Sequence, residues 1–109
     1  MLVFMRRLTL DTLFDPGLFR ALAEPTRIRL LEILMRAGGE ANVSAIAGQI
    51  DVDLSVVSRH LRELVRVGIL EVERVGRERW YRLRHDVLIA HFRELTRQLE
   101  ALRDGRACC

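Results

Sequence analysis

The sequence predicts a mainly α-helical domain with one small antiparallel β-hairpin, in the order helix-helix-helix-helix-strand-strand-helix. Two neighbouring patterns predict this class. Residues 54–67 have apolar side chains at helical spacing, whereas residues 70–83 alternate as strands do and turn at Gly76-Arg77. Similar helical spacing predicts three helices before this stretch and one after it. With 109 residues the chain is long enough for one domain with its own core, and we assign residues 1–109 to it.

The positive charge of the chain is concentrated rather than large. Half of the residues are apolar, as in a globular protein, and the formal net charge of +3 is too small to prove a polyanionic partner. All 18 basic residues are arginines, whose planar guanidinium suits phosphates and guanine edges. Eight of them crowd one part of the chain: Arg59, Arg62, Arg66, Arg74, Arg77, Arg79, Arg82 and Arg84.

The sequence predicts a cytoplasmic protein. Residues 1–5 are apolar, but Arg6 and Arg7 follow at once, so no signal peptide is expected. No apolar run approaches the roughly 20 residues of a membrane span, and no membrane partner is expected. In a reducing cytosol the thiols of Cys108 and Cys109, the last two residues, would remain free.

Two helices are predicted after a flexible arm at residues 1–12. Asp15-Pro16 starts the first with a carboxylate cap and a proline in the first turn. Glu24-Pro25 starts the second, and Gly38-Gly39 ends it. The apolar residues of the second helix are predicted to form one broad buried stripe: Ile28, Leu30, Leu31, Leu34 and Met35.

Residues 43–50 and 54–67 predict two helices joined by a tight turn. Asp53 stands where the N-cap of the fourth helix is expected. The short third helix follows from its apolar spacing at Val43, Ile46, Ala47 and Ile50. Two helices joined in this way match the helix-turn-helix motif of DNA-binding proteins.

The fourth helix has two different faces at about 100° per residue. Val57, Leu61 and Leu64 lie on one side and should be buried. The opposite side offers hydroxyls and guanidinium groups to bases and phosphates. Its candidate DNA-binding residues are Ser55, Arg59, Arg62 and Arg66, with Val56 and Ser58 flanking them. His60, also at the edge, is interpreted as structural. The alternative is an ordinary solvated face, but the preceding helix and the following hairpin favour DNA.

Residues 70–75 and 78–83 predict the two strands of the hairpin. Its anchors are expected to be Leu70, Val72, Trp80 and Tyr81. Arg74, Arg77 and Arg79 are expected near the tip, where a wing contacts the DNA backbone or the minor groove. They complete the set of candidate DNA-binding residues.

Residues 86–104 predict a last helix with a heptad seam made of Leu88, Phe92, Leu95, Leu99 and Leu102. A seam of this kind suits pairing with a second copy, and a protein that reads symmetric DNA suits a two-fold homodimer. The alternative is that the seam packs on its own domain. We favour the homodimer because the other helices already supply a core.

Taken together, these segments resemble the ArsR/SmtB family of winged helix-turn-helix repressors, which respond to metals and metalloids. The resemblance covers roughly residues 14–102 and rests on ALAEPTRIRLLEIL at residues 21–34, SVVSRHL at 55–61 with GIL at 68–70, and the turn from Gly76 to Tyr81. It implies a winged-helix homodimer that occupies an inverted-repeat operator in double-stranded DNA and leaves it when an inducer binds.

Two sensor sites that the resemblance implies are missing. A Cys-x-Cys pair would fall at Asn42 and Ser44, and the zinc ligands of the last helix would fall at His85, Val87, Gln98 and Ala101. His91 and Glu94 have His-x-x-Glu spacing. Since no second pair lies in register, we interpret them as a solvated pair beside the seam.

Cys108 and Cys109 are then the candidate metal ligands, in a tail at residues 105–109. Adjacent cysteines form a mutual disulfide only with strain, because the peptide between them is planar. As free thiolates they could bind As(III), Sb(III), Hg(II), Cd(II) or Cu(I). The resemblance implies arsenite as the inducer, since some members sense it through a vicinal pair in or after the last helix. The alternative is a tail with incidental thiols.

The predicted function is therefore a repressor that leaves its operator when arsenite or another soft ion binds Cys108 and Cys109. One alternative is a regulator of the same type with a non-metal or redox signal. Another is a winged-helix protein-interaction module, which would show no salt-sensitive DNA binding. An enzyme is not expected, and neither catalytic residues nor a catalytic cofactor are assigned, because no nucleophile stands with a base and no phosphate-binding glycine loop is present.

Overall fold

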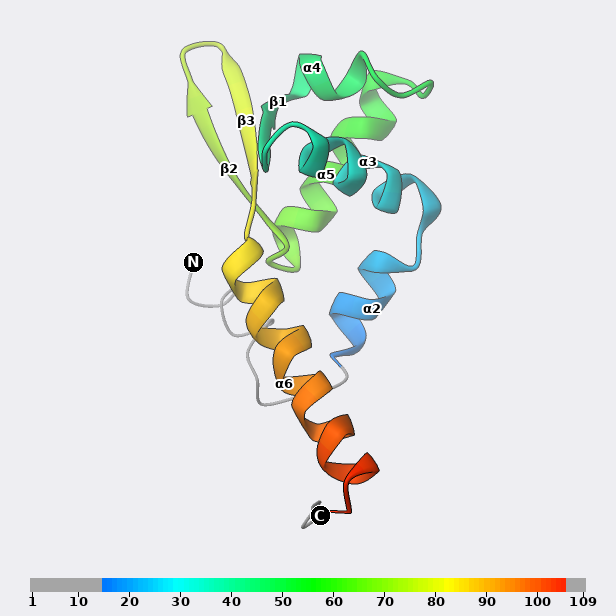
Figure 1. Cartoon of the computed structure of the whole chain (residues 1–109). Coiled ribbons are helices and arrows are strands. Elements are labelled where there is room, and N and C mark those ends of the chain that lie inside the picture. The colour runs from blue at the N-terminus through cyan, green and yellow to red at the C-terminus, as the bar shows by residue number, and fades with distance from the viewer. Residues whose placement is uncertain (1–14, 106–109) are drawn as a thin grey trace.

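The computed structural model describes residues 15–105, which form five helices and one three-stranded antiparallel sheet (Figure 1). In chain order the elements are α2 (Pro16–Leu22), α3 (Pro25–Arg36), β1 (Glu40–Asn42), α4 (Val43–Ala47), α5 (Leu54–Arg66), β2 (Leu70–Val75), β3 (Glu78–Leu83) and α6 (His85–Arg103). The predicted class, mainly helical with one hairpin, is confirmed. The arm at residues 1–12 and the cysteine pair lie outside the described residues.

Side-chain caps start three of the helices where the sequence places polar residues. Asp15 Oδ1 accepts a hydrogen bond from the Gly17 amide at 2.9 Å, and Glu24 Oε1 accepts one from the Arg27 amide at 3.0 Å. The second bond is the main reason that the pKa of Glu24 is lowered. Asp53 occupies the predicted N-cap position of α5, although its side chain makes no capping hydrogen bond.

Glycines in the left-handed region end α3 and α5. Gly38 has φ 85° and Gly68 has φ 92°. The following amides, those of Gly39 and Ile69, donate to the carbonyls of Leu34 at 2.8 Å and Leu64 at 3.0 Å. This is the Schellman motif. It gives hydrogen-bond donors to carbonyls that have none within the helix, and it turns the chain toward the sheet.

The core lies where α2, α3, α4 and α5 meet the base of the sheet. Its fully buried members are Leu18, Ala21, Leu30, Ile33, Leu34, Ile46, Val57, Leu61, Leu64, Val67, Ile69 and Leu70. The stripe predicted for α3 is partly wrong, because Ile28 and Met35 are 39% and 65% exposed. Since α3 is apolar around much of its circumference, its neighbours in the fold decide which side is buried.

The sheet has the order β1-β3-β2, and β1 was not predicted. Glu40, Ala41 and Asn42 pair with Arg82, Tyr81 and Trp80 of β3. A strand of three residues shows no alternation long enough to be recognised, and it is held by its pairing. α4 ends at Ala47, whereas a helix was expected to run to residue 50.

The hairpin strands have the predicted bounds, and the hairpin is anchored only at its base. Leu70 and Tyr81 are buried, whereas Trp80 is half-buried and Val72 is 43% exposed, so Val72 is not an anchor. In Figure 1 the two strands extend away from the helices, and burial therefore falls toward the turn.

α6 runs from the base of the hairpin in the opposite direction, beside α2 (Figure 1). Its bounds agree with the predicted 86–104 to within one residue at each end. Val87 and Leu88 pack against the core, but Phe92, Leu99 and Leu102 of the seam are exposed. Much of the seam thus lies free on this single chain.

Candidate nucleic-acid interface

α5 separates an apolar side from a basic side as the sequence predicts. Val57, Leu61 and Leu64 have no exposed surface, which fixes the rotation of the helix against the core. The side chains predicted to face outward are exposed: Ser55, Arg59, Arg62 and Arg66. Val56 and Ser58, predicted to flank them, are half-buried. The helix can therefore present donors to a groove without disturbing the core.

The outward side of α5 also holds an acid that the sequence prediction neglected. The Nε of Arg66 donates to Glu63 Oε1 at 3.0 Å, and Nη2 of the same guanidinium contacts Oε2. These bonds raise the pKa of Arg66. Because Glu63 already neutralises much of its charge, Arg66 offers less to a phosphate than Arg59 or Arg62 does.

The hairpin sorts its charges between two faces. Arg74 of β2 lies directly opposite Arg79 of β3, and Val72 lies opposite Tyr81. These four residues line one hollow of about 300 Å³ together with Arg62 and Val65 of α5. The structure thus brings an arginine of the helix together with two arginines of the hairpin. Arg77, at the turn, is exposed.

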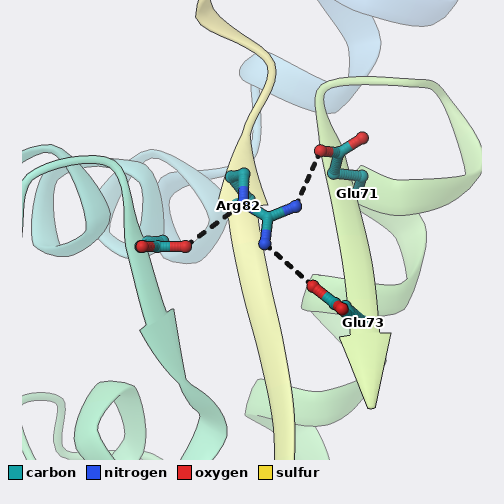
Figure 2. Close-up of polar contacts among 4 residues, drawn as sticks. Glu71, Glu73 and Arg82 are labelled. Carbon is teal, nitrogen blue, oxygen red and sulfur yellow. Dashed lines mark hydrogen bonds and ion pairs between the residues drawn. The ribbon is translucent and has the colours of Figure 1, made fainter. Parts of the chain in front are cut away.

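The other face of the hairpin carries its acids, and they hold Arg82 (Figure 2). The guanidinium donates to Glu71 Oε2 at 2.9 Å, Glu73 Oε1 at 3.0 Å and Glu40 Oε1 at 3.2 Å. Hydrogen bonds from Arg82 to these three carboxylates raise its pKa above the usual range. Arg82 therefore links all three strands through salt bridges, and its charge is not available to a nucleic acid.

A second hollow, of about 270 Å³, lies between α2, α3 and α5. It is lined by Arg20, Arg27, Arg59, His60, Glu63 and Arg66, among others. Sequence reasoning assigned no role to Arg20 or Arg27, because their distance from Arg59 along the chain hides their proximity in space. His60 is half-buried at its edge.

At the position of the missing Cys-x-Cys pair, one residue caps a helix and the other faces solvent. Asn42 caps α4, its Oδ1 accepting from the Ala45 amide at 2.8 Å, and Ser44 is exposed. Within residues 15–105, no group of three or more His, Cys, Asp or Glu side chains could hold a metal ion. Nor is any helix in that range long and apolar enough to cross a membrane.

His91 and Glu94 do not form the solvated pair that was expected. His91 is 1% exposed and packs edge-on against Phe19 and Phe92 at centroid distances of 6.3 and 5.4 Å. Glu94 instead accepts hydrogen bonds from Arg97 and Gln98, which lower its pKa to about 2. The contact with Phe19, on a helix far away in the sequence, explains why helical spacing alone misplaced His91.

Known proteins similar to this chain share its fold and its helix-turn-helix. Residues 22–73 match the family model described as a helix-turn-helix domain. A transcriptional repressor SmtB homolog of Synechocystis is 35% identical over 82 residues, covering 75% of this chain and 61% of that protein. An arsenic resistance transcriptional regulator of Pseudomonas putida is 34% identical over 77 residues, covering 71% and 59%. The chain thus spans about three fifths of the length of these relatives.

Two solved structures match this chain over most of their length. The crystal structure of an ArsR family transcriptional regulator has a TM-score of 0.67 and 32% identity, with 81% of this chain and 89% of that chain covered. The crystal structure of the AntR antimony-specific transcriptional repressor has a TM-score of 0.60 and 32% identity, with 87% of this chain and 89% of that chain covered. The family comprises DNA-binding regulators rather than enzymes. This chain belongs to the ArsR/SmtB family of winged helix-turn-helix transcriptional regulators.

Proposed function

We propose that this chain is a cytoplasmic repressor that binds an inverted-repeat operator as a homodimer, with residues 1–109 forming one winged helix-turn-helix domain. The observation that carries the proposal is the exposed basic side of α5 beside a hairpin face that bears arginines and no acid. A helix of this kind fits the major groove, and the hairpin then reaches the neighbouring backbone.

The residues divide by the contacts they can make. Ser55 and Arg59, in the first turns of α5, are proposed to meet base edges. Arg62 and the hairpin residues Arg74, Arg77 and Arg79 are proposed to contact phosphates, with Val56 and Ser58 at the margin. In a two-fold dimer the two copies of α5 would enter major grooves about 34 Å apart. Arg66, bound to Glu63, is expected to contribute least.

Binding to a fluorescent duplex from the region upstream of the protein's own reading frame tests this proposal. Fluorescence anisotropy should give an affinity that falls steeply with salt, because phosphate contacts release counterions. Arg59→Ala should weaken binding and relax sequence preference. The matched control is Arg93→Ala, an exposed arginine on α6. Equal binding by the wild type and Arg59→Ala, without salt dependence, would favour the protein-interaction module instead.

For the signal we propose a thiophilic ion, most simply As(III), bound by Cys108 and Cys109 and acting through the adjoining α6. Support comes from the chemistry of vicinal thiolates and from relatives whose names refer to arsenic resistance or antimony. Since As(III) favours three thiolates, a third ligand from the partner chain or a small thiol would complete the site. The ion must bind the DNA-free form more tightly in order to release DNA.

The same anisotropy assay tests the signal when arsenite, antimonite, Hg(II) or Zn(II) is added. Arsenite should release the wild type from the duplex and leave a Cys108→Ser/Cys109→Ser variant bound. Equal release of both proteins would eliminate these cysteines as the sensor while leaving the repressor intact. If no ion acts but a thiol oxidant releases only the wild type, the redox alternative holds.

A further inference from the structure

The hollow between α2, α3 and α5 is lined mostly by positive groups. Arg20 lies in the last turn of α2, Arg27 in the first turn of α3, and Arg59 on α5. Among the described residues, no carboxylate forms a salt bridge with any of these three guanidiniums. The one acid in the lining, Glu63, is bound to Arg66. The hollow therefore holds an excess of positive charge.

Arg27 carries an additional unsatisfied group. Its Nε is buried and has no hydrogen-bond partner within residues 15–105. Glu24 is the acid nearest to it in the chain, but that carboxylate caps α3 through the backbone amide of Arg27. A buried donor destabilises the fold when nothing accepts from it, and a bound ion is one of the usual acceptors for such a group. The donor, together with the three guanidiniums, points to an anionic ligand.

The size of the hollow and its donors narrow the kind of anion. Its volume of about 270 Å³ lies just below the roughly 300–1,000 Å³ typical of sites for larger organic ligands. Guanidinium forks match the oxygens of a phosphate, which can accept two parallel N–H bonds from each. Arg59 belongs both to this hollow and to the outward side of α5.

We propose that this hollow binds a phosphate group, and that Arg20 and Arg27 are ligands for it in addition to Arg59. The phosphate could belong to the DNA backbone beside α5 or to a free phosphate ion. If it belongs to DNA, the inference rests on the proposed function and adds two scaffold helices to the contact surface. If it is free, the ion competes with DNA at Arg59.

Two measurements on the full chain separate these sources. In the first, operator affinity is measured against salt for the wild type, Arg20→Ala, Arg27→Ala and the control Arg93→Ala. In the second, inorganic phosphate is titrated into the DNA-free wild type and the same variants by calorimetry in a phosphate-free buffer. Thermal melts check that each variant folds. If Arg27→Ala does not fold because Arg27 is half-buried, the exposed Arg20 still provides the test through Arg20→Ala.

For a DNA phosphate, Arg20→Ala and Arg27→Ala each weaken binding several-fold on any sequence. Each also makes the slope of log affinity against log salt shallower by about 0.9 for every phosphate that is no longer neutralised, and Arg93→Ala does not. For a free ion, inorganic phosphate binds the wild type, competes with DNA, and binds neither hollow variant. The inference is overturned if the variants match Arg93→Ala in affinity and slope and phosphate does not bind. A wild type that binds no DNA refutes the proposed function, while the titration still tests the hollow.

Discussion

Arg74 and Arg79 stand directly opposite each other on β2 and β3, on the hairpin face that shares a hollow with Arg62 of α5. Like charges in directly opposed positions destabilise an antiparallel pair. This arrangement therefore lowers the stability of the protein alone, and it suits the binding of an anion across the hairpin. A DNA phosphate bound there would relieve the repulsion.

Arg79→Thr should raise the free energy of unfolding by about 0.2–1 kcal/mol, because it removes the repulsion from Arg74. The same change should weaken operator binding and make its salt dependence shallower. Urea unfolding and fluorescence anisotropy measure the two effects. A variant that is less stable and binds DNA normally would show that Arg79 serves the fold.

Arg82→Gln should lower the midpoint of thermal unfolding, because one guanidinium ties Glu40, Glu71 and Glu73 across three strands. All four side chains are substantially exposed, so the loss should shrink at high salt. Circular dichroism melts at low and high salt check this. Arg79→Gln is the control, since its face of the hairpin carries no acid. Equal melting of both variants would argue against the tie.

Glu94 should make stability depend on pH in acid. Its pKa is lowered from 4.5 to about 2, chiefly by the hydrogen bonds from Arg97 and then by Gln98. As the pH falls, the carboxylate is protonated in the unfolded chain before it is protonated in the folded chain. Its contribution to stability is therefore present above about pH 4.5 and is lost as the pH falls toward 2. The stability difference between the wild type and Glu94→Gln should shrink over that window. Glu100→Gln, exposed on the same helix, is the control for the loss of a carboxylate.

His91→Leu should increase the free energy of unfolding by about 1 kcal/mol, because Nδ1 and Nε2 are buried without partners among the described residues. The aliphatic side chain keeps apolar contact with Phe19 and Phe92. Urea unfolding at neutral pH measures the change, and His91→Gln, which stays polar, should be destabilising. A loss of stability in His91→Leu would mean that the imidazole has a partner in the assembled protein.

Leu99→Glu/Leu102→Glu should convert the proposed homodimer into folded monomers. Both side chains are more than half exposed on the single chain, so the substitutions leave its core intact. Operator affinity should fall on the order of a hundredfold, because the second half-site is no longer tethered. Light scattering after size exclusion gives the oligomeric state. Arg93→Glu is the control, and a double variant that remains dimeric would place the interface elsewhere.

Local pattern alone determined which segments of this chain become its helices and its hairpin. The faces of α5 follow from the spacing of Val57, Leu61 and Leu64, and the hairpin bounds follow from alternation around Gly76. Both features depend on neighbours within a few residues in the sequence. The family resemblance rests on the same local segments, which is why the amino-acid sequence is enough to reveal it.

The tertiary structure decided the features that depend on residues far apart in the sequence. β1 exists because residues 40–42 pair with β3. His91 is buried against Phe19, and Arg82 is removed from the basic surface by three carboxylates on the two neighbouring strands. Arg20 and Arg27 meet the basic side of α5 only because α2, α3 and α5 converge. Periodicity specifies the face of each element, but only packing specifies what that face meets.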